Sequence, residues 1–125
     1  MSHYTVIKNT IITDLPILIK TLDKLGYEYR ENHSIEGHTG RRNMLLAVKI
    51  GTRYCVGFNR NSEKGGFSIT ADWGAAAVLR KDFLKSLYQT YNTEKVIAEA
   101  QVRGYSVIQQ TQSKSGIKIV LRKVG

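Results

Sequence analysis

Apolar residues in the first third of the chain change their spacing, which predicts a strand, a helix and a second strand. Residues 2–12 are rich in β-branched and aromatic side chains. The next apolar residues recur at helical spacing and predict a helix: Leu15, Leu18, Ile19, Leu22 and Leu25. Asp14 can cap this helix, Pro16 is tolerated in its first turn, and Gly26 can end it. Residues 27–35 are more polar and predict a strand near an edge of the sheet.

The centre of the chain alternates apolar and polar residues with a period of two, which indicates three strands joined by short turns. The apolar positions form three groups: Met44, Leu46, Val48 and Ile50; Tyr54, Val56 and Phe58; and Phe67, Ile69, Ala71 and Trp73. Arg53, Cys55 and Gly57 would lie on the opposite face of the middle strand. This pattern predicts an antiparallel meander with one buried face.

The last third predicts two helices and a hairpin. Residues 75–91 are helical, with Val78, Phe83, Leu84, Leu87 and Tyr91 as apolar positions. Asn92 and Thr93 can break this helix and cap a shorter one that Gly104 ends. Strands at 105–112 and 117–124 then form a hairpin. We expect Ile117, Ile119 and Leu121 to face the core, and Lys118 and Arg122 to face solvent.

One local pattern occurs twice. Ile19, Leu22, Gly26, Tyr27 and Tyr29 recur as Ile97, Ala100, Gly104, Tyr105 and Val107, always 78 positions later. Both stretches predict a helix, a glycine stop and an aromatic-led strand. Duplication would explain the pattern. The same pattern would also arise without duplication, if each helix has to end within a few residues and be followed at once by a strand.

These elements predict an α+β fold, a two-layer sandwich of a mostly antiparallel sheet with about three helices packed on one face. The 125 residues suit a single domain over 1–125. No stretch reaches the roughly 20 apolar residues that span a bilayer, and the N-terminus lacks the apolar core of a signal peptide. We therefore expect no membrane association, and a location in the cytoplasm or in a plastid stroma.

Charge is the strongest functional signal. Nineteen basic and ten acidic residues give a net charge of +9 and a pI near 9.8, which favours an anionic partner. The basic side chains of the central meander are candidates for its binding site: Arg41, Arg42, Lys49, Arg53 and Arg60. Exposed tyrosines among them could stack on bases. Tyr54, however, shares its parity with Val56 and Phe58, which places it in the core.

Catalytic and metal chemistry have weaker support. His33 and His38 lie five residues apart in a polar stretch, without the further ligands that zinc needs. Cys55 lies within a predicted strand, where a passive packing role is favoured over an activated thiol. Asp72 and Trp73 follow a strand and could shape a pocket, although Asp72 also suits a helix cap. We expect no catalytic residue, metal or cofactor.

Several segments carry a family resemblance, among them "YCVGFNR", "SITADWG" and "IKIVLRKV". The most specific are the "MSH" start, "ADW" at Ala71–Trp73, and a YxxxxVIxEAxxxGY pattern over 91–105. The chain resembles the hypothetical chloroplast reading frame thirty-five family, a domain of unknown function from cyanobacteria and algal plastids. It departs from that family at Gly74, where members usually carry a second tryptophan, and in its higher basic charge. The resemblance implies a cyanobacterial or plastid setting and leaves activity open.

Three functional hypotheses follow. The leading one is a non-enzymatic basic module that engages RNA or an acidic protein surface through the arginines of the meander, with Asp72 and Trp73 shaping an adjoining pocket. The second is a small enzyme or ligand-binding protein with a pocket formed by His33, His38, Asp72 and Cys55. The third is a structural subunit or homo-oligomer, paired through edge strands at 27–35 and 117–124.

Overall fold

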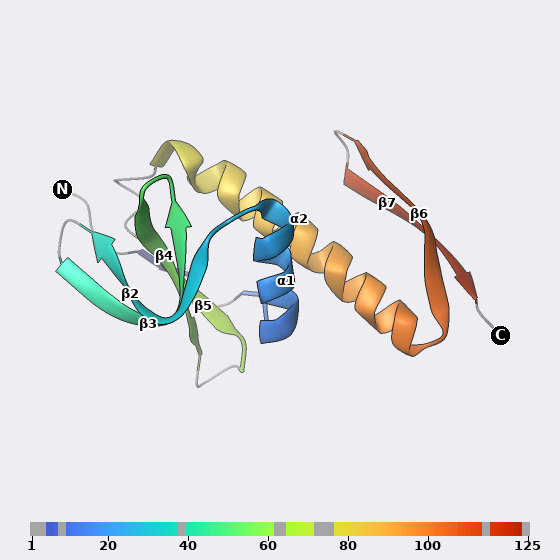
Figure 1. Ribbon diagram of the computed structural model, residues 1–125, viewed down its shortest axis with the longest axis horizontal. Helices are drawn as coiled ribbons and strands as arrows, with labels where there is room; N and C mark the ends of the chain where they lie inside the picture. The colour runs from blue at the N-terminus through green and yellow to red at the C-terminus, as the bar shows by residue number, and fades with distance from the viewer. Residues whose placement is uncertain are drawn as a thin grey trace.

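A computed structural model describes residues 5–7, 10–37, 40–61, 65–71, 77–113 and 116–123. The elements in chain order are β1 (Thr5–Ile7), α1 (Leu15–Leu25), β2 (Tyr29–Gly37), β3 (Gly40–Ile50), β4 (Arg53–Arg60), β5 (Phe67–Ala71), α2 (Ala77–Val102), β6 (Tyr105–Ser113) and β7 (Gly116–Lys123) (Figure 1). The predicted α+β class with mostly antiparallel pairing is confirmed. Neither helix of the described ranges has both the length and the apolar character to cross a membrane.

The larger sheet has five strands in the order β1-β5-β4-β3-β2. The predicted meander is its centre, and β2 is an edge strand, as its polarity indicated. Both helices pack on one face, which we call the helix side; the opposite face is the outer face (Figure 1). The buried residues of the helix-side core come from α1, α2 and the strands β3, β4 and β5, and include Leu18, Leu22, Leu46, Val48, Val56, Phe58, Phe67, Ile69, Ala71, Phe83, Leu87 and Tyr91.

The start of α1 is held by its own cap and by α2. Asp14 accepts a hydrogen bond from the Ile17 amide at 3.2 Å, and Gly26 ends the helix with φ 79°, as predicted. The buried Tyr91 hydroxyl accepts hydrogen bonds from the amides of Thr13 (3.0 Å) and Asp14 (3.1 Å). Tyr91 thereby satisfies backbone donors that precede the first turn of α1, and joins the two helices.

The prediction of about three helices is wrong, because α2 continues through Asn92 and Thr93. The Thr93 hydroxyl donates to the Gln89 carbonyl at 2.9 Å, within the helix, rather than capping a new one. Glu94 is buried and forms ion pairs with Lys20 and Lys24 of α1. Tertiary contacts at these positions therefore override the local signal for a break.

A β-bulge in β4 reverses the predicted faces of two residues. Val48 pairs with Val56, whereas the next residue, Lys49, pairs with Tyr54, so that Cys55 is the extra residue of the bulge. Cys55 packs in the helix-side core, and Tyr54 lies on the outer face with Lys49. The expectation that Tyr54 shares a face with Val56 is wrong, since one inserted residue switches the alternation.

A second, smaller cluster lies on the outer face and includes Met44, which the alternation had assigned to the main core. Met44 is buried with Ile35 and Ala47, and Tyr54 packs against them. Gly57 pairs with Ala47 across the strands. A Cβ atom on Gly57 would lie 2.2 Å from the Met44 Cγ, so Met44 can pack there only because Gly57 has no side chain.

We therefore expect Gly57→Ala to lower the free energy of unfolding by about 1–3 kcal/mol, the usual cost of overpacking. Urea denaturation would measure the shift in midpoint. Combining it with Met44→Ala should give less loss than the sum of the two single variants, because the small residue makes room for the new methyl group. A Gly57→Ala variant with an unchanged midpoint would contradict this packing.

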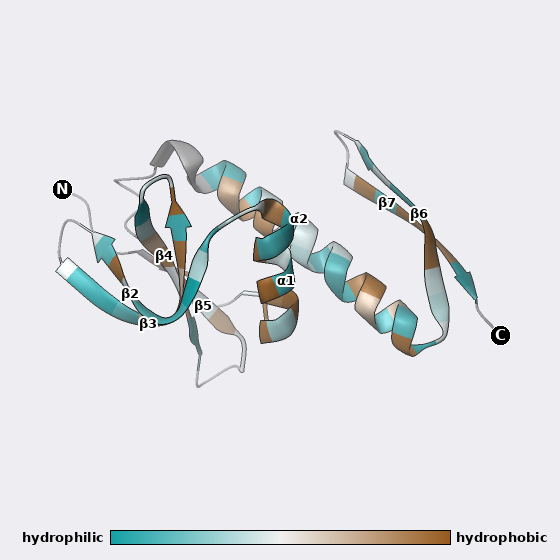
Figure 2. Ribbon diagram, viewed as in Figure 1, coloured by the Kyte–Doolittle hydropathy of each residue, from teal (hydrophilic) through white to brown (hydrophobic). Residues whose placement is uncertain are grey.

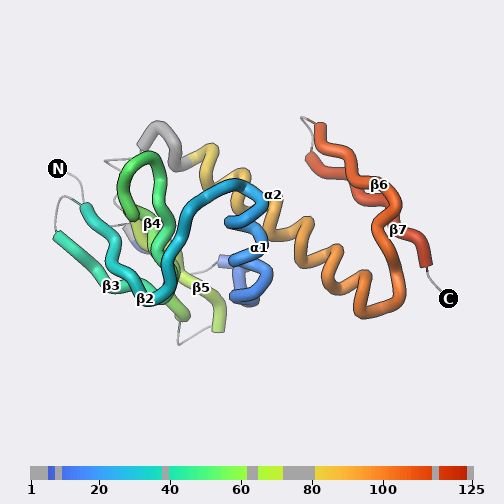
Figure 3. The backbone as a smooth tube through the Cα atoms, in the orientation of Figure 1, coloured from blue at the N-terminus to red at the C-terminus, as the bar shows by residue number. Residues whose placement is uncertain are grey.

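The C-terminal strands form the predicted hairpin but lie outside the two-layer sandwich. β6 and β7 make a separate two-stranded sheet, which lies at the end of α2 that is remote from the larger sheet (Figure 3). Ile117, Ile119 and Leu121 are half-buried, and neither core cluster includes them, so the expectation that they face the core is wrong. Alternation predicted their common side, but it carries no information on what covers that side.

Candidate functional site

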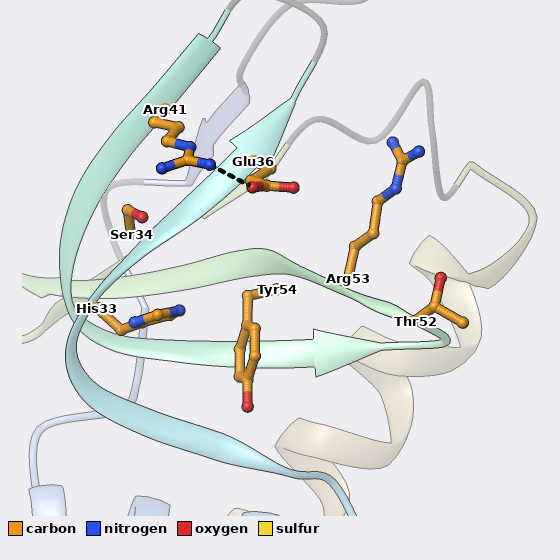
Figure 4. A pocket seen from close by; sticks show the side chains of 7 residues that line it. All are labelled: His33, Ser34, Glu36, Arg41, Thr52, Arg53 and Tyr54. Atoms are coloured by element: carbon orange, nitrogen blue, oxygen red, sulfur yellow. Dashed lines mark ion pairs between the residues drawn. The ribbon is translucent and has the colours of Figure 1, made fainter.

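A pocket of about 300 Å³ lies beside Tyr54 of the outer face, between the β2–β3 hairpin and the start of β4. It is lined by His33, Ser34, Glu36, Arg41, Thr52, Arg53 and Tyr54 (Figure 4). Its walls come from β2, β3, β4 and the turn between the last two strands. We call it the outer-face pocket. The N-terminal part of β3, which carries Arg41, is strongly hydrophilic (Figure 2).

A break in the β2–β3 pairing accompanies the bend that forms this pocket. Asn32 has a positive φ of 50°, and the regular pairing of β2 with β3 skips it. The amide of Leu45, the residue opposite, donates instead to the Asn59 side chain at 2.8 Å. Because the ladder is interrupted here, the hairpin beyond it can curve over the outer face.

Tyr54 is the centre of the pocket's contacts. Its ring meets the His33 ring edge-on, with centroids 4.8 Å apart (Figure 4). The Arg30 guanidinium carbon and the Lys49 ammonium lie 5.6 Å and 5.9 Å from the Tyr54 centroid, within the range of cation–π attraction. The Tyr54 hydroxyl donates to Glu28 at 2.9 Å. Two half-buried rings therefore lie among cations on an antiparallel sheet.

Glu28 completes this network at the rim. Lys49 lies 3.3 Å from its carboxylate. The hydrogen bond from Tyr54 and the charge and hydrogen bond of Lys49 lower the pKa of Glu28, with a smaller contribution from Arg30. The carboxylate is therefore ionised throughout the neutral range, and its pairing with Lys49 weakens only when the pH falls through that lowered pKa.

We expect Tyr54→Phe to raise the pKa of Glu28 toward the ordinary glutamate value, because the largest cause of the lowering is removed. A carboxyl ¹³C NMR titration would follow this residue directly. Tyr105→Phe, on the remote hairpin, serves as the control and should leave the Glu28 titration unchanged. If Glu28 titrates identically in all three proteins, the Tyr54 hydrogen bond does not persist in solution.

The two arginines of the outer-face pocket differ in their partners. Arg41 forms an ion pair with Glu36 at 3.2 Å across the β2–β3 hairpin, and both side chains are largely exposed. Arg53 is exposed, lines the same pocket, and forms no ion pair with any residue in the described ranges. Of the two arginines that line the pocket, Arg53 is therefore the one without an ion-pair partner in the described ranges.

The structure gathers some of the predicted cationic residues and separates others. Arg41 and Arg53 line the pocket, and Lys49 adjoins it through Tyr54. Arg42 lies on the same hairpin, opposite Ile35, but is not part of the lining. Arg60 lies at the other end of β4 from Arg53 and covers the Phe67 ring at 4.8 Å. The predicted pocket residues Asp72 and Trp73, together with His38, lie outside the described residues.

Sequence reasoning missed three residues of the lining, Ser34, Glu36 and Thr52, although Thr52 directly precedes Arg53 in a short turn. It also missed Arg30 and Glu28, which contact Tyr54 without lining the pocket. These two come from the polar edge strand and its approach, where nothing in the pattern marks a site. The role of Tyr54 depends on the bulge at Cys55, which the residue types alone do not reveal.

The described residues do not bring the candidate catalytic groups together. Cys55 is 6% exposed within the helix-side core, whereas His33 lies on the outer face against Tyr54. Among the residues that the structure describes, no group of three or more His, Cys, Asp or Glu side chains could hold a metal ion. What the outer-face pocket offers is charge, hydroxyl groups and aromatic surface, which are means of binding.

The fold and the pocket define a small α+β domain with a basic, aromatic pocket on the outer face of an antiparallel sheet. The family described as "protein of unknown function (DUF1257)" matches residues 21–120, and the chain belongs to this family. That match includes the whole lining of the outer-face pocket and most of the C-terminal hairpin. Neither the curated proteins nor the solved structures include a match.

Proposed function

We propose that this protein is a non-enzymatic basic module that binds single-stranded RNA at the outer-face pocket. The observation that carries the proposal is the contact between the His33 and Tyr54 rings, 4.8 Å apart, in a pocket that Arg41 and Arg53 also line. Unpaired bases stack on aromatic rings, while guanidinium groups neutralise the adjoining phosphates. The net charge of +9 favours the same class of partner.

The dimensions of the pocket also support a nucleotide unit. Its volume of about 300 Å³ is at the lower end of the range for ligand pockets, which suits one base and its phosphate better than a large cofactor. The hydroxyl groups of Ser34 and Thr52 add neutral donors and acceptors beside the charged ones. An acidic protein surface would satisfy the charges but would leave the paired rings without a role.

Binding should be measurable with a labelled single-stranded RNA of about 15 nucleotides, near the upper site size of small single-strand binders. We expect a dissociation constant on the order of micromolar at about 50 mM salt. Each neutralised phosphate contributes about 0.7 to the slope of log affinity against log salt, so three contacts give a slope of about −2.

Absence of RNA binding at low salt would refute the nucleic-acid proposal. A soluble polyglutamate that binds under those same conditions would then identify an acidic polypeptide as the partner of this face. A salt slope near zero would show that RNA binding, if present, does not depend on phosphate contacts.

We further propose that the chain is a member of the cyanobacterial and plastid reading-frame family that it resembles, and that it acts in the cytoplasm or the stroma. The "ADW" step and the pattern over residues 91–105 support this assignment. Affinity capture from such a host, with and without nuclease, would separate association through RNA from direct protein contact.

A further inference from the structure

The β6–β7 hairpin has two open edges in the described part of the chain, because each strand pairs only with the other. A two-stranded hairpin is marginally stable in water unless something packs on it or pairs with it. Here the hairpin makes its main contacts with α2, among the described elements, and the larger sheet lies elsewhere (Figures 1 and 3). Among the described elements, the hairpin is therefore the one that other parts of the fold cover least.

Apolar side chains collect where the hairpin meets α2. A groove of about 200 Å³ is lined by Val96, Glu99, Ala100, Arg103, Tyr105 and Leu121. Val96, one of these lining residues, is 47% exposed. On β6, Val107 pairs with Leu121 and Gln109 with Val120, so that Ile108 is the extra residue of a bulge, and it is 58% exposed. Several aliphatic side chains thus remain in contact with water at one end of the molecule.

The repeated sequence pattern indicates which edge should be covered. In both copies a helix ends at a left-handed glycine, Gly26 (φ 79°) or Gly104 (φ 86°), and a hairpin follows. In the first copy the second strand of the hairpin, β3, pairs with β4 on its other side. The equivalent edge of β7 has no such neighbour among the described strands. A strand paired with β7 would complete the second unit as β4 completes the first.

The positive charge of the hairpin indicates which class of partner would bind at the edge of β7. Neither β6 nor β7 contains an acidic residue, whereas Lys118, Arg122 and Lys123 are exposed on β7. A second copy of the chain, meeting itself across this edge, would bring these cations together. RNA would gain little from aliphatic side chains such as Val96 and Leu121. An acidic polypeptide with alternating apolar residues fits both features.

We propose that the open edge of β7 is a docking site for an extended acidic segment of another protein, which pairs with β7 as an added strand and packs apolar side chains against the groove beside α2. Backbone hydrogen bonds would supply affinity, and the cations of β7 would select acidic side chains. This site is distinct from the outer-face pocket, so the chain would engage RNA and protein on separate surfaces.

The test uses the full chain and a fluorescent peptide of about ten residues, the upper length of an ordinary strand, in which Glu and Val alternate. We expect saturable binding, with amide protection from hydrogen exchange increasing along β7. Replacing every Val by Ser keeps the charge and should weaken binding at least tenfold. Val96→Ser should weaken binding of the Glu–Val peptide without unfolding the protein, because Val96 is exposed on α2.

Charge reversal supplies the matched control. Lys118→Glu/Arg122→Glu should weaken peptide binding at least tenfold, whereas Lys81→Glu/Lys85→Glu makes the same change in net charge on exposed residues of α2 and should leave it within about twofold. The proposal is overturned by equal losses in the two variants, by equal binding of the Ser peptide, or by no binding. A dimer that Val96→Ser dissociates, or RNA binding that only the hairpin variant loses, would assign the surface to those partners instead.

Discussion

Reversing both arginines of the outer-face pocket, in Arg41→Glu/Arg53→Glu, is expected to weaken RNA binding by about a hundredfold. An arginine–phosphate pair at about 4 Å in water contributes about 1 kcal/mol, and reversal replaces this attraction with repulsion of similar size. Two positions therefore lose up to about 4 kcal/mol, which salt screening reduces to about 2.7 kcal/mol, or a hundredfold in affinity. Fluorescence anisotropy over a salt series would measure both the affinity and its salt dependence.

The salt series separates local contacts from net charge. Loss of two phosphate contacts should make the slope less negative by about 1.4, at about 0.7 for each contact. Lys81→Glu/Lys85→Glu carries the same charge change on exposed residues of α2, and it should reduce affinity only through the long-range field. Equal effects of the two pairs would show that RNA responds to the total charge and not to the outer-face pocket.

Substitution by neutral glutamine compares the contribution of Arg53 to RNA binding with that of the ion-paired Arg41. Arg41 has Glu36 as a partner, so part of its charge is already compensated, whereas Arg53 forms no ion pair in the described ranges. Arg53→Gln should therefore weaken RNA binding more than Arg41→Gln does. The reverse order would locate the phosphate contact on the hairpin rather than at the start of β4.

Much of the fold could be predicted because the responsible signals are local. The first helix has its cap, its apolar spacing and its terminal glycine within a dozen or so residues of one another. The fifth strand keeps strict alternation, and Phe67, Ile69 and Ala71 are all buried as expected. Where each residue type agrees with its neighbours, the pattern and the structure agree as well.

The errors arise where a distant contact or an inserted residue overrides the local pattern. Asn92 and Thr93 suggest a break, but the next residue, Glu94, is bound by lysines of another helix. The bulge at Cys55 moves Tyr54 to the outer face, which turns an expected core residue into the centre of the candidate site. Arg41 and Arg53 could be identified as candidate cations from the sequence. That they line the same pocket as the rings of His33 and Tyr54 could not.

The lysines that bind Glu94 should prove to be the strongest surface contribution to stability. Glu94 is 1% exposed, with Lys20 at 3.5 Å and Lys24 in contact with its other oxygen. Lys20→Met/Lys24→Met preserves helix propensity and leaves a buried carboxylate without a cation. Removing the partners of a buried charge costs about 3–5 kcal/mol. Because the lysines are half-exposed, we expect the lower end of this range, measured as a shift in the urea midpoint.

Two further variants determine whether the loss comes from the stranded charge. Lys81→Met/Lys85→Met removes the same number of cations from exposed positions of α2 and should change stability by less than about 0.5 kcal/mol. Adding Glu94→Met to Lys20→Met/Lys24→Met replaces the whole cluster with apolar side chains and should recover most of the lost stability. If the triple variant is no more stable than the double variant, the lysines act through packing of their methylene chains. Recovery would show that these ion pairs compensate a buried charge at the position where α2 would otherwise break.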